Sequence, residues 1–168
     1  GLPSMRRFYT DDAGYALATQ VDTDLHALGS GLQGGTGGGT YDAAVIGDDG
    51  STLWDGSANT NTGNGAALAD AGIRKMIQTL DDEDVPMMNR NLVIPPVEKN
   101  SLLGLSRFTE QAYTGETGGG NSIRNGRVGD IYGVQVYVST NCPTIQADDA
   151  STNYRVGMLL HKDALVFA

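Results

Sequence analysis

Glycine-rich loops divide this chain into short segments, and they constrain its fold more than any other feature. The chain carries 24 glycines in 168 residues, about twice the usual share of about 7%. Two glycine-rich runs span residues 34–40 and 109–127, and the loop at 47–65 is rich in turn residues and poor in core residues. Such runs favour flexible or tightly turned backbone. We therefore expect helices and strands only between these loops.

Charge and composition exclude several classes of protein. The net charge is −9, whereas a specific nucleic-acid reader needs a basic surface. No apolar run approaches the roughly 20 residues of a membrane helix, so we expect no membrane partner. The one cysteine, Cys142, allows no intrachain disulfide framework. Association of so acidic a chain with its own copies must rest on shape and apolar contact.

Apolar spacing predicts two main helices. Apolar residues recur every three or four positions from Ala13 to Leu28, which is one helical face, and Gly29 is the predicted end of this helix. The second apolar face runs from Ala69 to Leu80. We expect the second helix to be capped by one of the two residues at positions 64–65.

An acidic cluster, residues 81–84, follows the second helix. Acidic side chains oppose the helix dipole at a C-terminus, so the cluster is expected just beyond the last turn. The remaining predicted elements are strands at 40–46, 91–94 and 128–139, a helix at 97–108, and strands at 154–160 and 164–168 joined by a polar turn at 161–163. This order of elements favours a mixed α+β fold.

No motif supports catalysis, a cofactor or a metal. The glycine runs contain no Gly-Lys pair, and the run at 34–40 follows a helix and precedes a strand, the reverse of a dinucleotide-binding context. The alternating polar loop that begins at Asp55 has Thr60 and Ala66 where a calcium loop needs Gly and Glu. His161 and Asp163 belong to no nucleophile signature. We expect no catalytic residue, no cofactor, no metal and no enzyme activity.

The chain from residue 66 onwards resembles a known family. The segments that carry the resemblance are ALADAGIRKMIQTL with DDEDVP behind it, NRNLVIPPVEKNSLLGLSRF, NGRVGDIYGVQVYVSTNCP and LLHKDALVFA, with DDAGYALATQVDTDL nearer the N-terminus. Their order and spacing resemble the major capsid proteins of tailed bacteriophages, which have the Hong Kong 97-type fold.

The resemblance implies an α+β Hong Kong 97-type capsid fold with a spine helix, a peripheral-domain sheet and an axial domain. Residues 1–62 and 138–168 would form the peripheral domain, with the C-terminal part of the spine helix in its first segment. Residues 63–137 would form the axial domain, with a tip loop near 115–127. The N-terminal arm and extended hairpin of the family have no counterpart in this sequence, so we expect a processed or partial chain.

The resemblance also implies a function. The chain would be a major capsid protein that assembles into homo-pentamers and homo-hexamers of an icosahedral phage head around a double-stranded DNA genome. Assembly in the host cytoplasm, procapsid maturation, and partners such as portal, scaffold and decoration proteins would follow. The acidic chain would contact the enclosed DNA only weakly and without sequence specificity.

Charged residues are the candidate contacts between subunits, because repeated weak ion pairs add up in a closed shell. The candidates are Arg74, Lys75, Asp81, Asp82, Glu83, Asp84, Arg90, Arg107, Arg124 and Arg127. Two other functions fit the same composition. One is a different virion component, such as a decoration or tail protein. The other is a carbohydrate-binding or hydrolytic domain that uses Trp54 and the tyrosines as a stacking surface.

Overall fold

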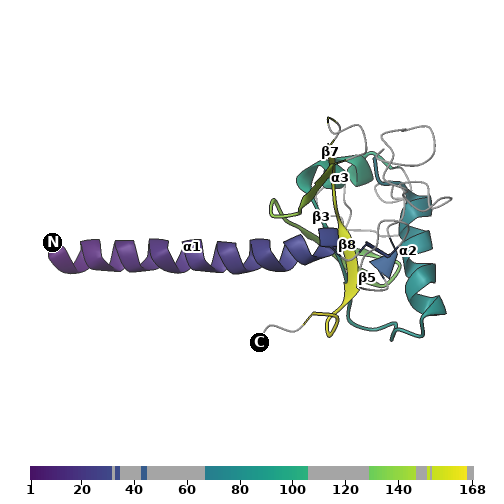
Figure 1. The fold of residues 1–168 in the computed structure, drawn as a ribbon, viewed down its shortest axis with the longest axis horizontal. Coiled ribbons are helices and arrows are strands. Elements are labelled where there is room, and N and C mark those ends of the chain that lie inside the picture. The colour runs from purple at the N-terminus through teal and green to yellow at the C-terminus, as the bar shows by residue number, and fades with distance from the viewer. Residues whose placement is uncertain are drawn as a thin grey trace, which may run out of the picture.

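A long helix projects from a small body of mixed helices and strands (Figure 1). The computed structural model of the chain describes residues 1–31, 33–34, 43–44, 67–105, 129–146, 151 and 153–165. The helices in these ranges are α1 (Leu2–Gly31), α2 (Asp70–Asp82) and α3 (Pro96–Leu103). The strands are β1 (Gln33–Gly34), β2 (Ala43–Ala44), β3 (Arg90–Ile94), β4 (Asp130–Ile131), β5 (Val134–Val138), β6 (Thr144–Gln146), β7 (Asn153–Arg155) and β8 (Met158–His161).

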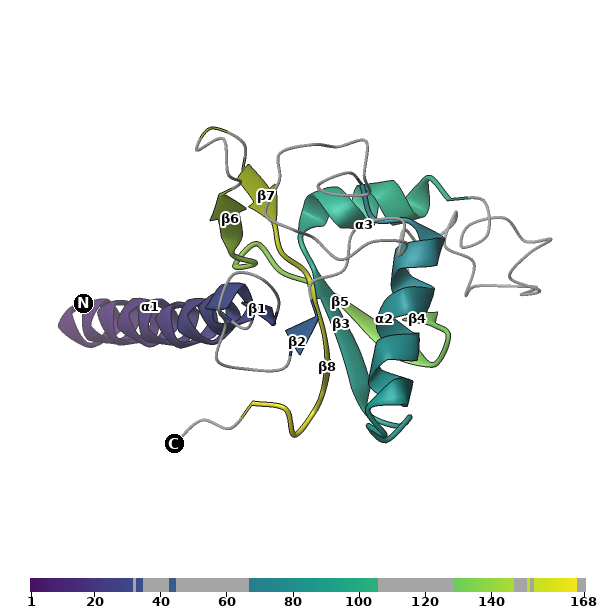
Figure 2. The same ribbon diagram turned by 45° about the vertical axis from the view of Figure 1, so that its right-hand side comes forward.

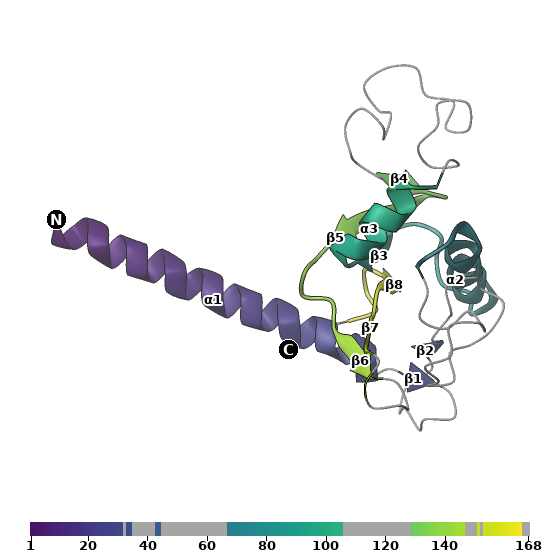
Figure 3. The same ribbon diagram turned by 90° about the horizontal axis from the view of Figure 1, so that it is seen from above.

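Helix α1 is longer than its apolar pattern predicts. It begins at Leu2 rather than near residue 11 and ends at Gly31, two residues beyond the predicted end. Proline is tolerated in the first turn of a helix, so Pro3 does not prevent the early start. At 1.5 Å per residue the helix is about 45 Å long, and Figure 3 shows it meeting the body only at its C-terminal end.

Helix α2 begins at Asp70, so the predicted cap at residues 64–65 is wrong. The N-cap is Ala69, which provides no side-chain hydrogen bond. Glu98 in the first turn of α3 instead accepts a hydrogen bond of 2.7 Å from the backbone N–H of Leu68. A carboxylate distant in sequence thus holds the chain just before α2, which local sequence patterns cannot reveal.

Four strands form the central sheet, in the order β4-β5-β3-β8. Strand β3 pairs in parallel with β5 and antiparallel with β8, in a register that places Leu92 opposite Val136 and Leu159. Helices α1 and α2 lie on opposite sides of this sheet (Figure 2). Two further pairs are the parallel β1–β2 and the antiparallel β6–β7.

The core lies between the sheet and the helices α2 and α3. Burial alternates along β3 so that Leu92 and Ile94 face inwards, as expected for a strand with one face on the core. The fully buried cluster is Ile73 of α2, Leu92, Ile94, Leu102 of α3, Ile131 and Val134. The apolar faces of both helices therefore pack on the same sheet.

The strand predicted at 128–139 is a hairpin. Ile131 pairs with Val134, and the two residues between them, Tyr132 and Gly133, have φ values of 51° and 79°. Positive φ at both central residues is the requirement of the type I′ turn that favours two-residue hairpins. The glycine at the second position made this turn possible, but the tyrosine at the first hid it from sequence analysis.

Several predicted boundaries need correction. The segment predicted as one strand at 154–160 is divided into β7 and β8 by Val156 and Gly157. Helix α3 ends at Leu103 rather than at residue 108, with Gly104 as its C-cap. The polar turn at 161–163 is confirmed at residues 162–163, whereas residues 164–165 are not in a strand and residues 166–168 lie outside the described ranges. Of the strand predicted at 40–46, the described part is β2.

The sheet joins segments far apart in the chain. Strand β8, near residue 160, is hydrogen-bonded to β3, near residue 92. The predicted peripheral domain contains β8 and the predicted axial domain contains β3, so these two domains would share one sheet. In the part of the chain that the structure describes, no helix is long and apolar enough to cross a membrane.

Candidate assembly surfaces

The end of α2 and the loop from α2 to β3 carry an exposed group of acidic and methionine side chains, which we call the acidic turn: Asp82, Glu83, Asp84, Met87 and Met88. All five are exposed, and the two methionines are 76% and 77% exposed. The prediction that the acidic cluster follows the helix is half correct, because Asp81 and Asp82 lie within α2 and Glu83 is its C-cap.

Arg90 explains how acidic residues are tolerated at this helix end. Its guanidinium forms an ion pair of 2.7 Å with Asp81. The same group donates hydrogen bonds to the carbonyl oxygens of Val85 at 2.5 Å and Pro86 at 2.9 Å. The Arg90 side chain is only 2% exposed. This candidate for a subunit contact is therefore committed to its own chain, where it fixes the loop that presents the acidic turn.

The remaining described candidates lie along α2. Arg74 forms an ion pair of 3.0 Å with Asp70 one turn earlier, and Asp70 also accepts a hydrogen bond from the Tyr132 hydroxyl. Arg74 is exposed and Lys75 is half-buried. The structure thus brings Asp81 and Arg90 together and leaves Arg74 at the other end of the helix from the acidic turn. Arg107, Arg124 and Arg127 lie outside the described residues.

The N-terminal part of α1 is a second surface, which sequence analysis missed. Every residue from 1 to 18 is exposed. The large apolar side chains in this part are Leu2, Met5, Phe8, Tyr9, Tyr15 and Leu17, each more than half exposed. The apolar residues before position 11 were the available signal, but the predicted helical face began only at Ala13.

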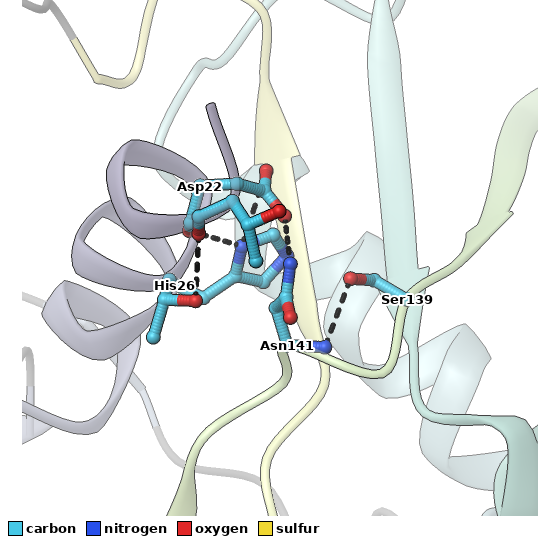
Figure 4. Close-up of polar contacts among 6 residues, drawn as sticks. Asp22, His26, Ser139 and Asn141 are labelled. Carbon is cyan, nitrogen blue, oxygen red and sulfur yellow. Dashed lines mark hydrogen bonds and ion pairs between the residues drawn. The ribbon is translucent and has the colours of Figure 1, made fainter. Parts of the chain in front are cut away.

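Polar contacts fasten the other end of α1 to the body (Figure 4). The Asn141 side-chain amide donates to the carboxylate of Asp22 at 2.5 Å, and the backbone N–H of Asn141 donates to the hydroxyl of Ser139 at 3.1 Å. His26 is buried, with its Nδ1 2.7 Å from the carbonyl oxygen of Asp22. The segment after β5 is thereby tied to the last third of α1.

Cys142 directly follows Asn141, which makes the contact between α1 and the body. Burial raises the pKa of the Cys142 thiol, and the nearby Asp22 carboxylate adds to that effect, while the Arg155 guanidinium opposes it. The thiol is therefore held in its neutral form, which is a poor nucleophile. Arg155 also donates a hydrogen bond of 3.2 Å to the Cys142 carbonyl oxygen. These features give Cys142 a packing role.

The described residues offer surfaces for contact and no metal centre. No three His, Cys, Asp or Glu residues among them lie close enough to hold a metal ion. The side chain of His161 contacts Asp163 around a turn, with Nδ1 of His161 accepting from the backbone N–H of Asp163 at 3.3 Å.

A comparison with known protein families identifies the family of this chain. The family model described as phage capsid protein matches residues 6–163. The chain belongs to this phage capsid protein family. Its role is that of a structural subunit of the virion shell, in a family whose members are not enzymes, and a capsid protein associates with other capsid subunits. No curated protein and no solved structure gives a significant match.

Proposed function

We propose that this capsid protein is the major capsid protein of a tailed phage. Copies of it form pentamers and hexamers, and these rings tile an icosahedral head around double-stranded DNA. The fold would be of the Hong Kong 97 type, with α1 as the spine helix. Assembly would take place in the host cytoplasm as a procapsid that later matures.

One observation carries the proposal beyond the family itself. The family match covers residues 6–163, and within that range α1 extends exposed apolar side chains away from the body. A lone helix gains most of its stability from packing on a neighbour. A subunit that is complete only when neighbours cover this helix suits a shell built of many copies.

The domain division and the axial tip belong to the same proposal. Residues 63–137 would face the symmetry axis of each ring, with residues 115–127 at the tip, and residues 1–62 and 138–168 would form the periphery. Strand β8 would then be the segment by which the peripheral domain completes the axial sheet. Portal, scaffold and decoration proteins would contact the assembled rings, and the enclosed DNA would be held weakly.

Electron microscopy of the purified chain, expressed with any upstream coding sequence, tests the proposal. We expect closed shells of uniform diameter in negative stain, made of this chain alone. A chain that stays monomeric, and only adds to shells made by another protein, would instead be a decoration protein. Tubes in place of closed shells would indicate a tail component.

Charge reversal at the proposed tip provides a second test. We expect Arg124→Glu combined with Arg127→Glu to reduce the yield of rings and shells, because each exposed ion pair is worth only about 0–1 kcal/mol and repetition around the ring multiplies the loss. Particle counts in micrographs measure the yield, and Arg7→Glu combined with Lys162→Glu, at two exposed positions, is the control with the same change in net charge. Unchanged yield in the double variant would remove both arginines from the proposed interface.

A further inference from the structure

The first turns of α1 carry a stripe of exposed side chains. We call Leu2, Met5, Arg6 and Tyr9 the α1 stripe. These positions are i, i+3, i+4 and i+7, which share one face of a helix. All four are exposed, and the three apolar members are 66%, 55% and 63% exposed. The stripe therefore combines an apolar surface with one positive charge at its edge.

Arg6 differs from its neighbour Arg7 in the contacts it makes. Arg7 lies on the opposite face of the helix, where its guanidinium is 4.0 Å from the Asp11 carboxylate. Within the described residues no ion pair is recorded for Arg6. The charge that borders the apolar stripe is thus available to a partner, whereas the charge on the other face already has one.

The acidic turn has the complementary composition. Asp82, Glu83 and Asp84 are exposed, and they lie beside the exposed Met87 and Met88. Asp81 is paired with Arg90, and that contact anchors the loop and leaves the other three carboxylates facing solvent. An apolar pair bordered by negative charge matches the apolar stripe bordered by Arg6.

These two surfaces cannot meet within one chain. Helix α1 extends away from the side of the body that carries α2, so the α1 stripe and the acidic turn lie at opposite ends of the molecule (Figures 1 and 2). A contact between different patches of identical copies is heterologous, and repeated contacts of this kind generate rings or open arrays.

We propose that the α1 stripe of one subunit docks on the acidic turn of a neighbouring copy. Met87 and Met88 would cover Leu2, Met5 and Tyr9, because methionine adapts to irregular apolar partners. Arg6 would face the carboxylates of Asp82 to Asp84. The partner is a second copy of this chain, and this inference rests on the proposed shell function by naming one contact within it.

Disulfide cross-linking between two tagged versions of the full chain tests the contact directly. One version carries Met5→Cys and the other carries Met88→Cys, and the two are mixed under mild oxidation. The matched control replaces Met5→Cys by Phe8→Cys, at a position on the same turn but off the stripe. Native Cys142 is buried and sets the background in the wild-type mixture. We expect severalfold more covalent heterodimer from the Met5–Met88 pair than from the Phe8–Met88 pair.

Charge exchange supplies the second measurement. Arg6→Glu should lower the heterodimer yield about tenfold, since the weak contact is repeated across an assembly, while Arg7→Glu should leave it nearly unchanged. Adding Glu83→Lys to the partner chain should restore the yield. Circular dichroism of each variant verifies that the helix content is preserved.

The outcomes separate this inference from the proposed function. Equal cross-linking of the stripe and off-stripe pairs, or no rescue by Glu83→Lys, overturns the inference even if shells form. Shells absent in micrographs but selective cross-linking present would overturn the shell function and leave the contact in place.

Discussion

Helix α1 and the central sheet differ in the exposure of their apolar side chains. In the body, Leu92, Ile94 and Leu102 are at most 1% exposed, and two helices share one sheet surface. In α1, Leu17 is 68% exposed, and neighbouring aromatic residues are exposed as well. The body buries its apolar side chains within one chain, whereas α1 leaves them available to other chains.

Because of this difference, the body and α1 contribute unequally to the stability of the monomer. Buried apolar surface contributes about 25 cal/mol per Å² to the folded state, and the exposed apolar side chains of α1 make little such contribution in the single chain. The monomer should therefore behave as a stable body with a weakly held helix. Each of the following predictions compares a change in one region with a matched change in the other.

The largest contrast is expected from leucine truncation. Leu102→Ala should lower the free energy of unfolding by about 2–5 kcal/mol, because it leaves a cavity in the core. Leu17→Ala should change it by less than about 0.5 kcal/mol, because that side chain is exposed. Urea denaturation of the monomer measures both. Similar losses in the two variants would mean that α1 is packed within its own chain.

A smaller contrast is expected between two arginines. Arg90→Met removes charged hydrogen bonds to two carbonyl oxygens and an ion pair to Asp81, at a cost of about 1.5–3 kcal/mol. Arg74→Met removes an exposed ion pair worth about 0–1 kcal/mol. The comparison again uses denaturant unfolding. If Arg90→Met were as mild as Arg74→Met, the acidic turn would not depend on Arg90 for its shape.

Two glycines give effects of opposite sign. A Cβ at Gly157 would lie 3.0 Å from the carbonyl oxygen of Val93, so Gly157→Ala should cost about 1–3 kcal/mol through overpacking. A Cβ at Gly14 meets no atom within 4 Å, so Gly14→Ala should stabilise α1 by up to about 1 kcal/mol through helix propensity. Thermal unfolding reports the first change and helical circular dichroism the second. A stabilising Gly157→Ala would show that β8 can move away from β3.

The smallest effect concerns Cys142, where the two regions meet. The pKa of its thiol is raised in the folded protein, so the folded state keeps a proton that the unfolded chain loses at about pH 8.5. The stabilising contribution is complete below that pH and declines as pH rises towards the folded-state pKa. The free energy of unfolding should therefore fall more steeply above pH 8 in the wild type than in Cys142→Ala. Parallel slopes would refute this linkage.

Sequence patterns predicted the body better than its connections. The strand predicted at 91–94 is β3, which begins one residue earlier, and the helix along Ile73 was predicted from apolar spacing; both belong to the buried core. The hairpin at Tyr132 and the carboxylate of Glu98 at Leu68 were missed. Apolar periodicity reports a local face, while a positive-φ tyrosine and a contact between residues 30 positions apart have no local signature.

The candidate surfaces were likewise predicted only in part from the sequence. Charge alone singled out Arg90 as a contact between subunits, although burial commits it to Asp81 of the same chain. Charge also singled out Asp82 to Asp84, which are exposed. The α1 stripe was missed because the predicted helical face began at Ala13, so the apolar residues before it were assigned to no helix. The family was predicted from motif order and is confirmed by the match over residues 6–163.

The pairing of β8 with β3 also sets the order of events during synthesis. Strand β3 acquires its second neighbour only when residues 158–161 have left the ribosome, long after β3 itself has emerged. Contacts so distant along the chain slow the closing step of folding. A nascent chain would thus complete this sheet only after the roughly 60 residues between β3 and β8 have been synthesised.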